Sequence, residues 1–287
     1  MVSIKKNLKR VWESYSKNPT EVYEDGMGSG FLGEYEEAIE FFDRVDYLIL
    51  RVNDIKKSAL FYKAVALGEL GKHEEAITAY KKNLKWDKED ERILTNIGFE
   101  YAELNKFEEA IQYYNKSIKI DPKNADVWSN KADALLGLER FKEALVCANK
   151  SLKIDPEFMG ALENKSHALS NLGKNDEAIE ISKKIIELEP EEYANWEVLG
   201  IQYRLINNLE KSLESFNESQ KYDLTVGSVW YNKACVLSGL DRKEESLDAL
   251  FIAISIEPEN LVDLKDDEDL KNIHSTERFQ KLLSLSV

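Results

Sequence analysis

Residues 106–122 read KFEEAIQYYNKSIKIDP, and this stretch has the pattern of an amphipathic helix. Two acidic residues stand near its start, apolar residues follow at helical spacing, and Pro122 closes it. Four of the five prolines in the chain stand at positions 122, 156, 190 and 258, so the successive gaps are 34, 34 and 68, which is twice 34. A fixed period of this length is typical of a repeat protein.

The stretch defines a register for the rest of the chain. Units that begin at residues 57, 91, 125, 159, 193 and 227 carry the same kinds of residue at the same positions. The eighth position is small throughout: Ala64, Gly98, Ala132, Ser166, Gly200 and Ala234. The twentieth is also small: Ala76, Ala110, Ala144, Ala178, Ser212 and Ser246. The fourteenth is apolar: Leu70, Leu104, Leu138, Leu172, Ile206 and Leu240. Each unit therefore has two apolar stripes of helical period and predicts two closely packed helices.

The fifteenth position predicts where the first helix of each unit ends. Its residues are Gly71, Asn105, Glu139, Gly173, Asn207 and Asp241. Glycine, asparagine and aspartate tolerate the left-handed backbone that ends many helices, whereas Glu139 adopts it at a cost. Acidic residues then follow in the first turn of the second helix, where the helix dipole favours negative charge.

These residues resemble the tetratricopeptide repeat. Trp128 and Trp196, with Leu199, Gly200 and Tyr203 after the latter, are similar to the first helix of that family, and residues 106–122 are similar to its second helix and closing proline. The resemblance covers residues 57–260 and implies an all-α fold, a right-handed α-solenoid of about seven helix pairs with capping helices at both ends. Lys88 and Leu224 stand where the family has proline, so we expect those two turns to be less sharply fixed.

The flanking segments complete a four-part organisation. Residues 1–18 predict an amphipathic capping helix, and residues 19–56 fit a divergent first repeat with a four-residue insertion near residues 51–54. Residues 57–260 form the six units. Residues 261–287 predict a closing segment that covers the last apolar face, with a helix capped by Ser275 or Thr276.

The stretch GMGSGFLG, residues 26–33, contains a G-x-G-x-x-G pattern but does not predict a nucleotide site. No strand precedes it, three glutamates follow it, and residues 20–43 contain no Lys or Arg to hold a phosphate. The repeat register accounts for the glycines instead. Gly33 is the turn between two helices, Gly26 is the small eighth residue, and Gly28 and Gly30 lie inside a weak helix. We expect no cofactor.

Composition excludes several classes of function. The formal net charge is −15, and the basic residues alternate with acidic ones, so nucleic acid is an unsuitable partner. No run of 18 apolar residues could span a membrane. Two cysteines without metal spacing, Cys147 and Cys235, favour a reducing compartment and a cytoplasmic location. The three histidines are isolated and adjacent glutamates face solvent, so we expect no metal site and no enzyme.

The resemblance implies that the first helices line a concave groove, with the second, fifth, sixth, ninth and twelfth or thirteenth positions pointing into it. The sixth position reads Tyr62, Asn96, Asn130, Asn164, Val198 and Asn232. An asparagine side chain both donates and accepts hydrogen bonds, so a row of them can pair with the backbone of an extended peptide. The alternative is that these asparagines are repeat consensus residues that cap or pack within their unit.

We therefore predict an interaction adaptor that holds a protein or peptide segment, neutral to basic in charge, in the groove. The predicted partner-binding residues are Asn96, Asn130, Asn164, Asn232, Arg92, Phe99, Asp133, Glu163, His167, Glu197, Arg204 and Tyr231. Acids outnumber bases in this set, which favours a basic or neutral partner. The alternative function is a structural protein that self-associates through its terminal units and has no groove ligand.

Overall fold

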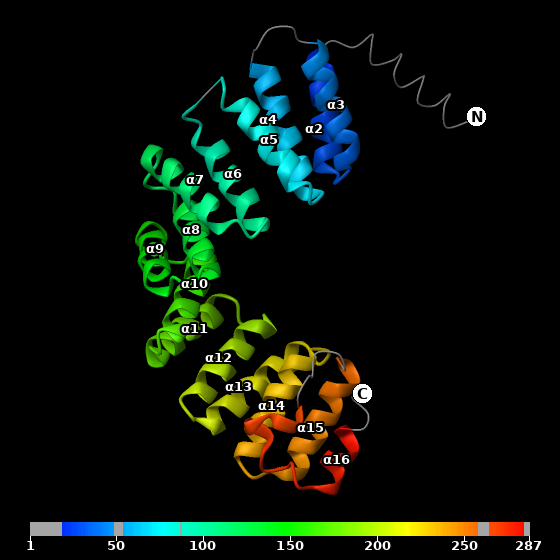
Figure 1. Cartoon of the computed structure of the whole chain (residues 1–287), viewed down its shortest axis with the longest axis vertical. Helices are drawn as coiled ribbons and strands as arrows, with labels where there is room; N and C mark the ends of the chain where they lie inside the picture. The colour runs from blue at the N-terminus through cyan, green and yellow to red at the C-terminus, as the bar shows by residue number, and fades with distance from the viewer. Residues whose placement is uncertain (1–18, 49–53, 87, 258–263, 284–287) are drawn as a thin grey trace, which may run out of the picture. The chain divides into compact units, whose positions relative to one another are not determined.

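The computed structural model describes residues 19–48, 54–86, 88–257 and 264–283. These residues form fifteen α-helices and two short 3-10 helices, and the described part of the chain contains no strand. They divide into two compact units at Arg140 and Phe141, with residues 153–155 grouped with the first unit. Within each unit, Figure 1 shows the helices following one another in chain order.

The first unit consists of three helix pairs and one further helix. The helices are α2 (Pro19–Phe31), α3 (Tyr35–Leu48), α4 (Asp54–Glu69), α5 (His73–Asn83), α6 (Glu91–Glu103), α7 (Phe107–Ile120) and α8 (Ala125–Gly137). Each helix packs mainly against the helices next to it in sequence. The predicted amphipathic helix of residues 1–18 lies outside the described residues.

The second unit continues the same pattern. Its helices are α9 (Phe141–Ile154), α10 (Met159–Asn171), α11 (Asn175–Leu188), α12 (Tyr193–Leu205), α13 (Leu209–Tyr222), α14 (Gly227–Gly239), α15 (Lys243–Ile256), the 3-10 helices η2 (Leu264–Asp266) and η3 (Glu268–Leu270), and α16 (Glu277–Leu283). The prediction of an all-α solenoid built from consecutive helix pairs is confirmed.

The repeat register of the sequence is also the register of the structure. The first helices α6, α8, α10, α12 and α14 begin at the first residue of their units, and α4 begins three residues before its unit. Every fifteenth residue has a positive φ, including Glu139 at 57° and Asn105 at 55°. Gly33 has a φ of 76°, which confirms it as a turn between two helices.

The eighth residue of a first helix packs directly against the twenty-fourth residue, on the second helix. A Cβ atom on Gly98 would lie 2.5 Å from the Tyr114 ring, and one on Gly200 would lie 2.7 Å from the Phe216 ring. Real Cβ contacts are not that short, so these rings occupy the space of the absent side chain. Both rings are buried. The close approach of the two helices therefore depends on the small eighth residue.

Tryptophan side chains fix the turns between units. The indole N–H groups of Trp128, Trp196 and Trp230 donate to the backbone carbonyls of Pro122, Pro190 and Leu224 at 3.0, 2.8 and 2.9 Å. The turn at Leu224 thus has the same bond as the two proline turns, because the bond needs only the carbonyl oxygen, which every residue supplies. That this turn is less sharply fixed than a proline turn stays a prediction.

The glycines of α2 differ in their surroundings. A Cβ on Gly26 would lie 2.8 Å from the Phe42 ring, so Gly26 is the small eighth residue of its helix pair. A Cβ on Gly28 would meet nothing within 4 Å, and one on Gly30 would only touch Ala38 at 4.0 Å. Gly28 and Gly30 are therefore not required by packing.

We predict that replacing Gly28 and Gly30 together by Ala stabilises α2, by about 1 kcal/mol for each residue, because alanine loses less backbone entropy in a helix. The matched control is Gly26→Ala, which should lower the melting temperature because the new methyl group displaces the Phe42 ring. Thermal unfolding followed by circular dichroism measures both effects. A loss of stability in the double variant would contradict the assignment.

We also predict that Glu139→Gly stabilises the protein by up to about 1 kcal/mol, because the left-handed conformation of Glu139 strains an ordinary side chain. Asn105→Gly is the control and should change stability less, since asparagine tolerates this conformation better. Urea unfolding of the three proteins measures the difference. Equal effects at the two positions would show that backbone strain at Glu139 is not significant.

Candidate functional site

The candidate site is the face formed by the second, fifth, sixth, ninth and twelfth residues of the first helices, here called the first-helix face. In the first unit it includes Arg92, Phe99 and Asp133, which are exposed. Phe99 leaves 48% of its surface in contact with solvent, which is unusual for so large an apolar side chain. Arg92 donates to Asp90, the residue that caps α6, and its guanidinium lies 5.6 Å from the Phe61 ring centre.

The asparagines of the first unit are half-buried on this face. Asn96 donates to the Tyr80 hydroxyl at 3.0 Å, which connects α6 to the preceding helix pair. Tyr80 is the twenty-fourth residue of that pair, and it is buried. An amide nitrogen has two hydrogens and the amide oxygen accepts two bonds, so this contact uses only part of what Asn96 offers. Asn130 occupies the same position on α8.

In the second unit, a pocket of about 460 Å³ opens on the first-helix face between α10, α11 and α12. Three of the predicted residues, Glu163, Asn164 and His167, line it. Partial burial, and then repulsion from Glu189, raise the pKa of the Glu163 carboxyl group. The structure therefore brings these three predicted residues together around one cavity.

Glu197 connects two first helices in the same unit. Its Oε1 atom accepts hydrogen bonds from Ser228 at 2.8 Å and from Asn232 at 3.3 Å. Val198 is 44% exposed and interrupts the asparagine row with an apolar side chain. Asn232 thus holds a neighbouring repeat with one of its bonds, as Asn96 does in the first unit.

The C-terminal segment, residues 264–283, reaches two of the predicted partner-binding residues. Tyr231 donates to Asp267, and Arg204 donates to Asp269. Sequence reasoning missed these contacts, because nothing in the local pattern of the acidic turn indicates that it folds back onto α12 and α14. Arg204 and Tyr231 are therefore already engaged by a carboxylate of the same chain.

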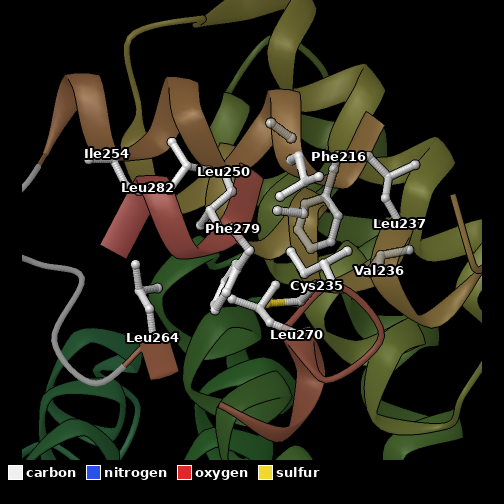
Figure 2. Packing of buried hydrophobic residues seen from close by; sticks show 14 of the residues in the cluster. Phe216, Cys235, Val236, Leu237, Leu250, Ile254, Leu264, Leu270, Phe279 and Leu282 are labelled. Carbon is white, nitrogen blue, oxygen red and sulfur yellow. The ribbon is translucent and has the colours of Figure 1, made fainter. Parts of the chain in front are cut away.

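Apolar residues hold this segment in place. Leu264, Leu270, Ile273, Phe279 and Leu282 join the core of α14 and α15. Figure 2 shows Leu270 and Phe279 beside the Cys235 side chain. The helix α16 begins after Thr276, whose hydroxyl accepts from the Phe279 N–H at 3.2 Å, so Thr276 rather than Ser275 is the cap.

The chemistry of the site is that of hydrogen bonding and apolar contact. Among the residues that the structure describes, no group of three or more His, Cys, Asp or Glu side chains could hold a metal ion. Both cysteines are buried, and burial raises the pKa of Cys235 to about 12, so its thiol is protonated at neutral pH. Protonated thiols are poor nucleophiles. No described helix has the length and hydrophobicity needed to cross a membrane.

Comparison with known proteins agrees with the geometry. A sequence profile of the tetratricopeptide repeat matches residues 91–124 and 125–158, and a second profile of the same description matches residues 58–90 and 160–192. Four tetratricopeptide repeats therefore lie within residues 58–192 of this chain, and repeats of this kind support a protein-interaction scaffold as the general type of function. No curated protein matches the sequence significantly.

Several solved structures share the fold. A tetratricopeptide repeat protein from Parabacteroides merdae ATCC 43184 has 17% identity and a TM-score of 0.68, over 93% of this chain and 98% of that protein. YrrB, a tetratricopeptide repeat protein with an unusual peptide-binding site, has 22% identity and a TM-score of 0.54, over 63% and 93%. MamA from Desulfovibrio magneticus RS-1 has 17% identity and a TM-score of 0.56, over 58% and 94%. At these identities the likeness establishes the fold.

We predict that replacing Asp267 and Asp269 by Asn loosens the C-terminal segment and exposes Cys235. Asparagine at position 267 can still cap η3, and an exposed ion pair contributes at most about 1 kcal/mol, so the melting temperature should change little. Labelling of Cys235 by a maleimide should become several times faster. Cys147 is the internal control, and its rate should not change. Equal acceleration at both thiols would indicate global destabilisation instead.

Proposed function

We propose that this protein is a cytoplasmic adaptor that holds an extended peptide or protein segment across its first-helix face. The observation that carries the proposal is the recurrence of half-buried asparagines on a face that also exposes apolar side chains. Asn96, Asn130 and Asn164 stand at the same position of three repeats, close in register to the exposed Phe99 and Val198. Amide groups can pair with a peptide backbone, while apolar side chains receive alternate side chains of the same segment.

The repeats and the two flanking segments have different roles in this proposal. Residues 57–260 supply the binding helices, while the divergent repeat of residues 19–56 and the segment of residues 261–287 end the array. At the C-terminal end, Asp267 and Asp269 occupy Tyr231 and Arg204, so a partner meets those two residues only if the acidic turn moves.

Charge defines the kind of segment that fits. Asp133, Glu163 and Glu197 lie on the first-helix face, and the whole chain carries a formal net charge of −15. Salt screens the attraction between opposite charges, and the screening length is about 10 Å at 0.1 M ionic strength. We therefore expect a neutral or basic segment to bind, and its affinity to fall as salt is added. Metal, nucleotide and catalysis have no part in this proposal.

The test begins with a random peptide library selected against the wild-type protein. We predict that replacing Asn96, Asn130, Asn164 and Asn232 together by Ala weakens the best selected peptide by at least about tenfold, because each lost hydrogen bond contributes about 1 kcal/mol. The stability should fall only modestly, mainly through loss of the bond from Asn96 to Tyr80. Isothermal titration calorimetry and thermal unfolding measure the two quantities.

The matched control replaces Asn149 and Asn217, which are exposed residues of second helices, and should leave the affinity unchanged. Unchanged affinity in the quadruple variant would contradict the proposal, and a collapsed fold would favour the consensus-residue alternative. Light scattering over a range of protein concentrations distinguishes the adaptor from the alternative, a structural protein that self-associates. If particles grow with concentration and no library peptide is selected, self-association replaces the adaptor.

A further inference from the structure

The glycine-rich stretch of residues 26–33 borders a pocket in the first unit. This pocket has a volume of about 200 Å³ and is lined by residues of α2, α3 and α4. Gly26 and Gly30 line it from α2. A Cβ atom on Gly30 would meet only Ala38, at 4.0 Å, so glycine leaves the space of a side chain open at this position. The pocket is smaller than the sites of drug-sized ligands and suits a single side chain.

The pocket belongs to the first-helix face. Met27 and Val65, which line it, are the ninth residues of their first helices, and Tyr62 is the sixth residue of its unit. Phe42 lines it from the twenty-fourth position of the preceding helix pair. The pocket of about 460 Å³ in the second unit has Ser182 at that position. The two pockets therefore occupy similar places in the repeat but differ in chemistry.

Aromatic rings form much of the lining. Tyr35, Phe42 and Tyr62 all contribute to it. Phe42 is buried, whereas Tyr35 is half-buried and Tyr62 is 37% exposed, so the two tyrosines offer the accessible ring surface. Tyr62 stacks on Phe42 with 6.3 Å between ring centres and meets Phe61 edge-on at 5.3 Å. Other rings therefore hold Tyr62 in place before a ligand binds.

The charges around the pocket favour a cation. Glu69 lines the pocket and is exposed, and none of the nine described lining residues is a lysine, arginine or histidine. Glu69 is the last residue of α4, and Gly30 lies in the last turn of α2. Neither helix has a basic residue in its last turn. Because the carboxyl end of a helix carries partial negative charge, both helix ends add to the attraction of Glu69 for a cation.

Guanidinium groups of the chain already lie over neighbouring rings. The Cζ atom of Arg44 is 5.4 Å from the ring centre of Phe41, and that of Arg92 is 5.6 Å from the ring centre of Phe61. Both distances are within the range of about 6 Å in which a ring face attracts a cation. Phe41 and Phe61 each stand one residue before a ring that lines the pocket. The same type of contact is therefore available to a guanidinium group from outside the chain.

We propose that this pocket binds the side chain of an arginine in the partner segment, with the guanidinium group against Tyr35 and Tyr62 and paired with Glu69. This inference rests on the proposed function, names a charged anchor of the bound segment and adds the divergent repeat to the binding surface. Guanidinium is flat and weakly hydrated, stacks on aromatic rings and pairs with a carboxylate through two parallel N–H bonds. The ammonium group of lysine is compact and strongly hydrated, so it gains less from the rings.

The test uses three synthetic peptides of the sequence Ala-X-Ala, acetylated and amidated, where X is arginine, citrulline or lysine. Citrulline has the shape of arginine without its charge, and lysine has the charge without the flat group. Binding is followed at low salt by the NMR shifts of the labelled full-length protein. We expect saturable shifts in α2, α3 and α4. The dissociation constant should be about tenfold lower for arginine than for citrulline, which loses both the ring attraction and the ion pair, with lysine between the two.

Two variants test the two parts of the site. Glu69→Gln keeps the size of the side chain but removes its charge, so the arginine peptide should bind about fivefold more weakly and the citrulline peptide equally well. Tyr62→Leu removes a ring and should weaken the arginine peptide by about threefold. The matched control is Glu103→Gln. Glu103 is exposed at the thirteenth position of its unit, as Glu69 is, but does not line the pocket, so the affinity should not change. Thermal unfolding verifies that each variant is folded.

The inference is overturned if citrulline or lysine binds the wild-type protein as tightly as arginine, or if no saturable shift appears in α2 to α4. It is also overturned if folded Glu69→Gln keeps the wild-type affinity, or if Glu103→Gln weakens binding equally, since general negative charge then explains the result. Failure of this kind differs from failure of the proposed function. Library peptides that depend on the asparagines but not on arginine would keep the adaptor and remove only this anchor.

Discussion

The close contact between the eighth residue of a first helix and the twenty-fourth residue on the second helix is the constraint on which the helix pairs depend. Two helices pack closely when a small residue on one receives a large side chain from the other. Gly98 with Tyr114 and Gly200 with Phe216 show the tight form of this contact, since an added methyl group would overlap the ring. The helices can then repeat every 34 residues, because the same contact recurs in the same register.

The same contact connects the fold to the candidate site. Where the ring is present, its polar end can be held by the next first helix, as Asn96 holds Tyr80. Where the ring is replaced by Ser182, the space that it would fill becomes a pocket on the face that we propose for binding. A solenoid depends on contacts between neighbouring repeats, so one repeat can lose part of its packing while its neighbours keep theirs. A binding pocket can therefore arise inside a regular array without any change of fold.

The periodic features could be predicted from the sequence, because a repeated contact leaves a repeated residue. The prolines at intervals of 34, the small eighth residues and the positive φ of Asn105 and Glu139 all belong to this class. Contacts that occur once leave no period. The hydrogen bonds from Tyr231 to Asp267 and from Arg204 to Asp269 join residues that are 36 and 65 positions apart, and no local sequence pattern predicts them. The pocket was missed for a related reason: Ser166 fits the small eighth position, and only its pairing with Ser182 at the twenty-fourth position, 3.0 Å away between hydroxyl oxygens, opens a cavity.

A crystal structure of the free protein, at a resolution that shows ordered water, tests the central claim most directly. If the Ser166 and Ser182 pair opens a true pocket between α10, α11 and α12, the structure will show it unfilled by side chains and holding ordered water. If Ile185, Val198 and Ile201 instead close over the two serines, the pairing of the eighth and twenty-fourth residues does not control access to the site, and the account is wrong.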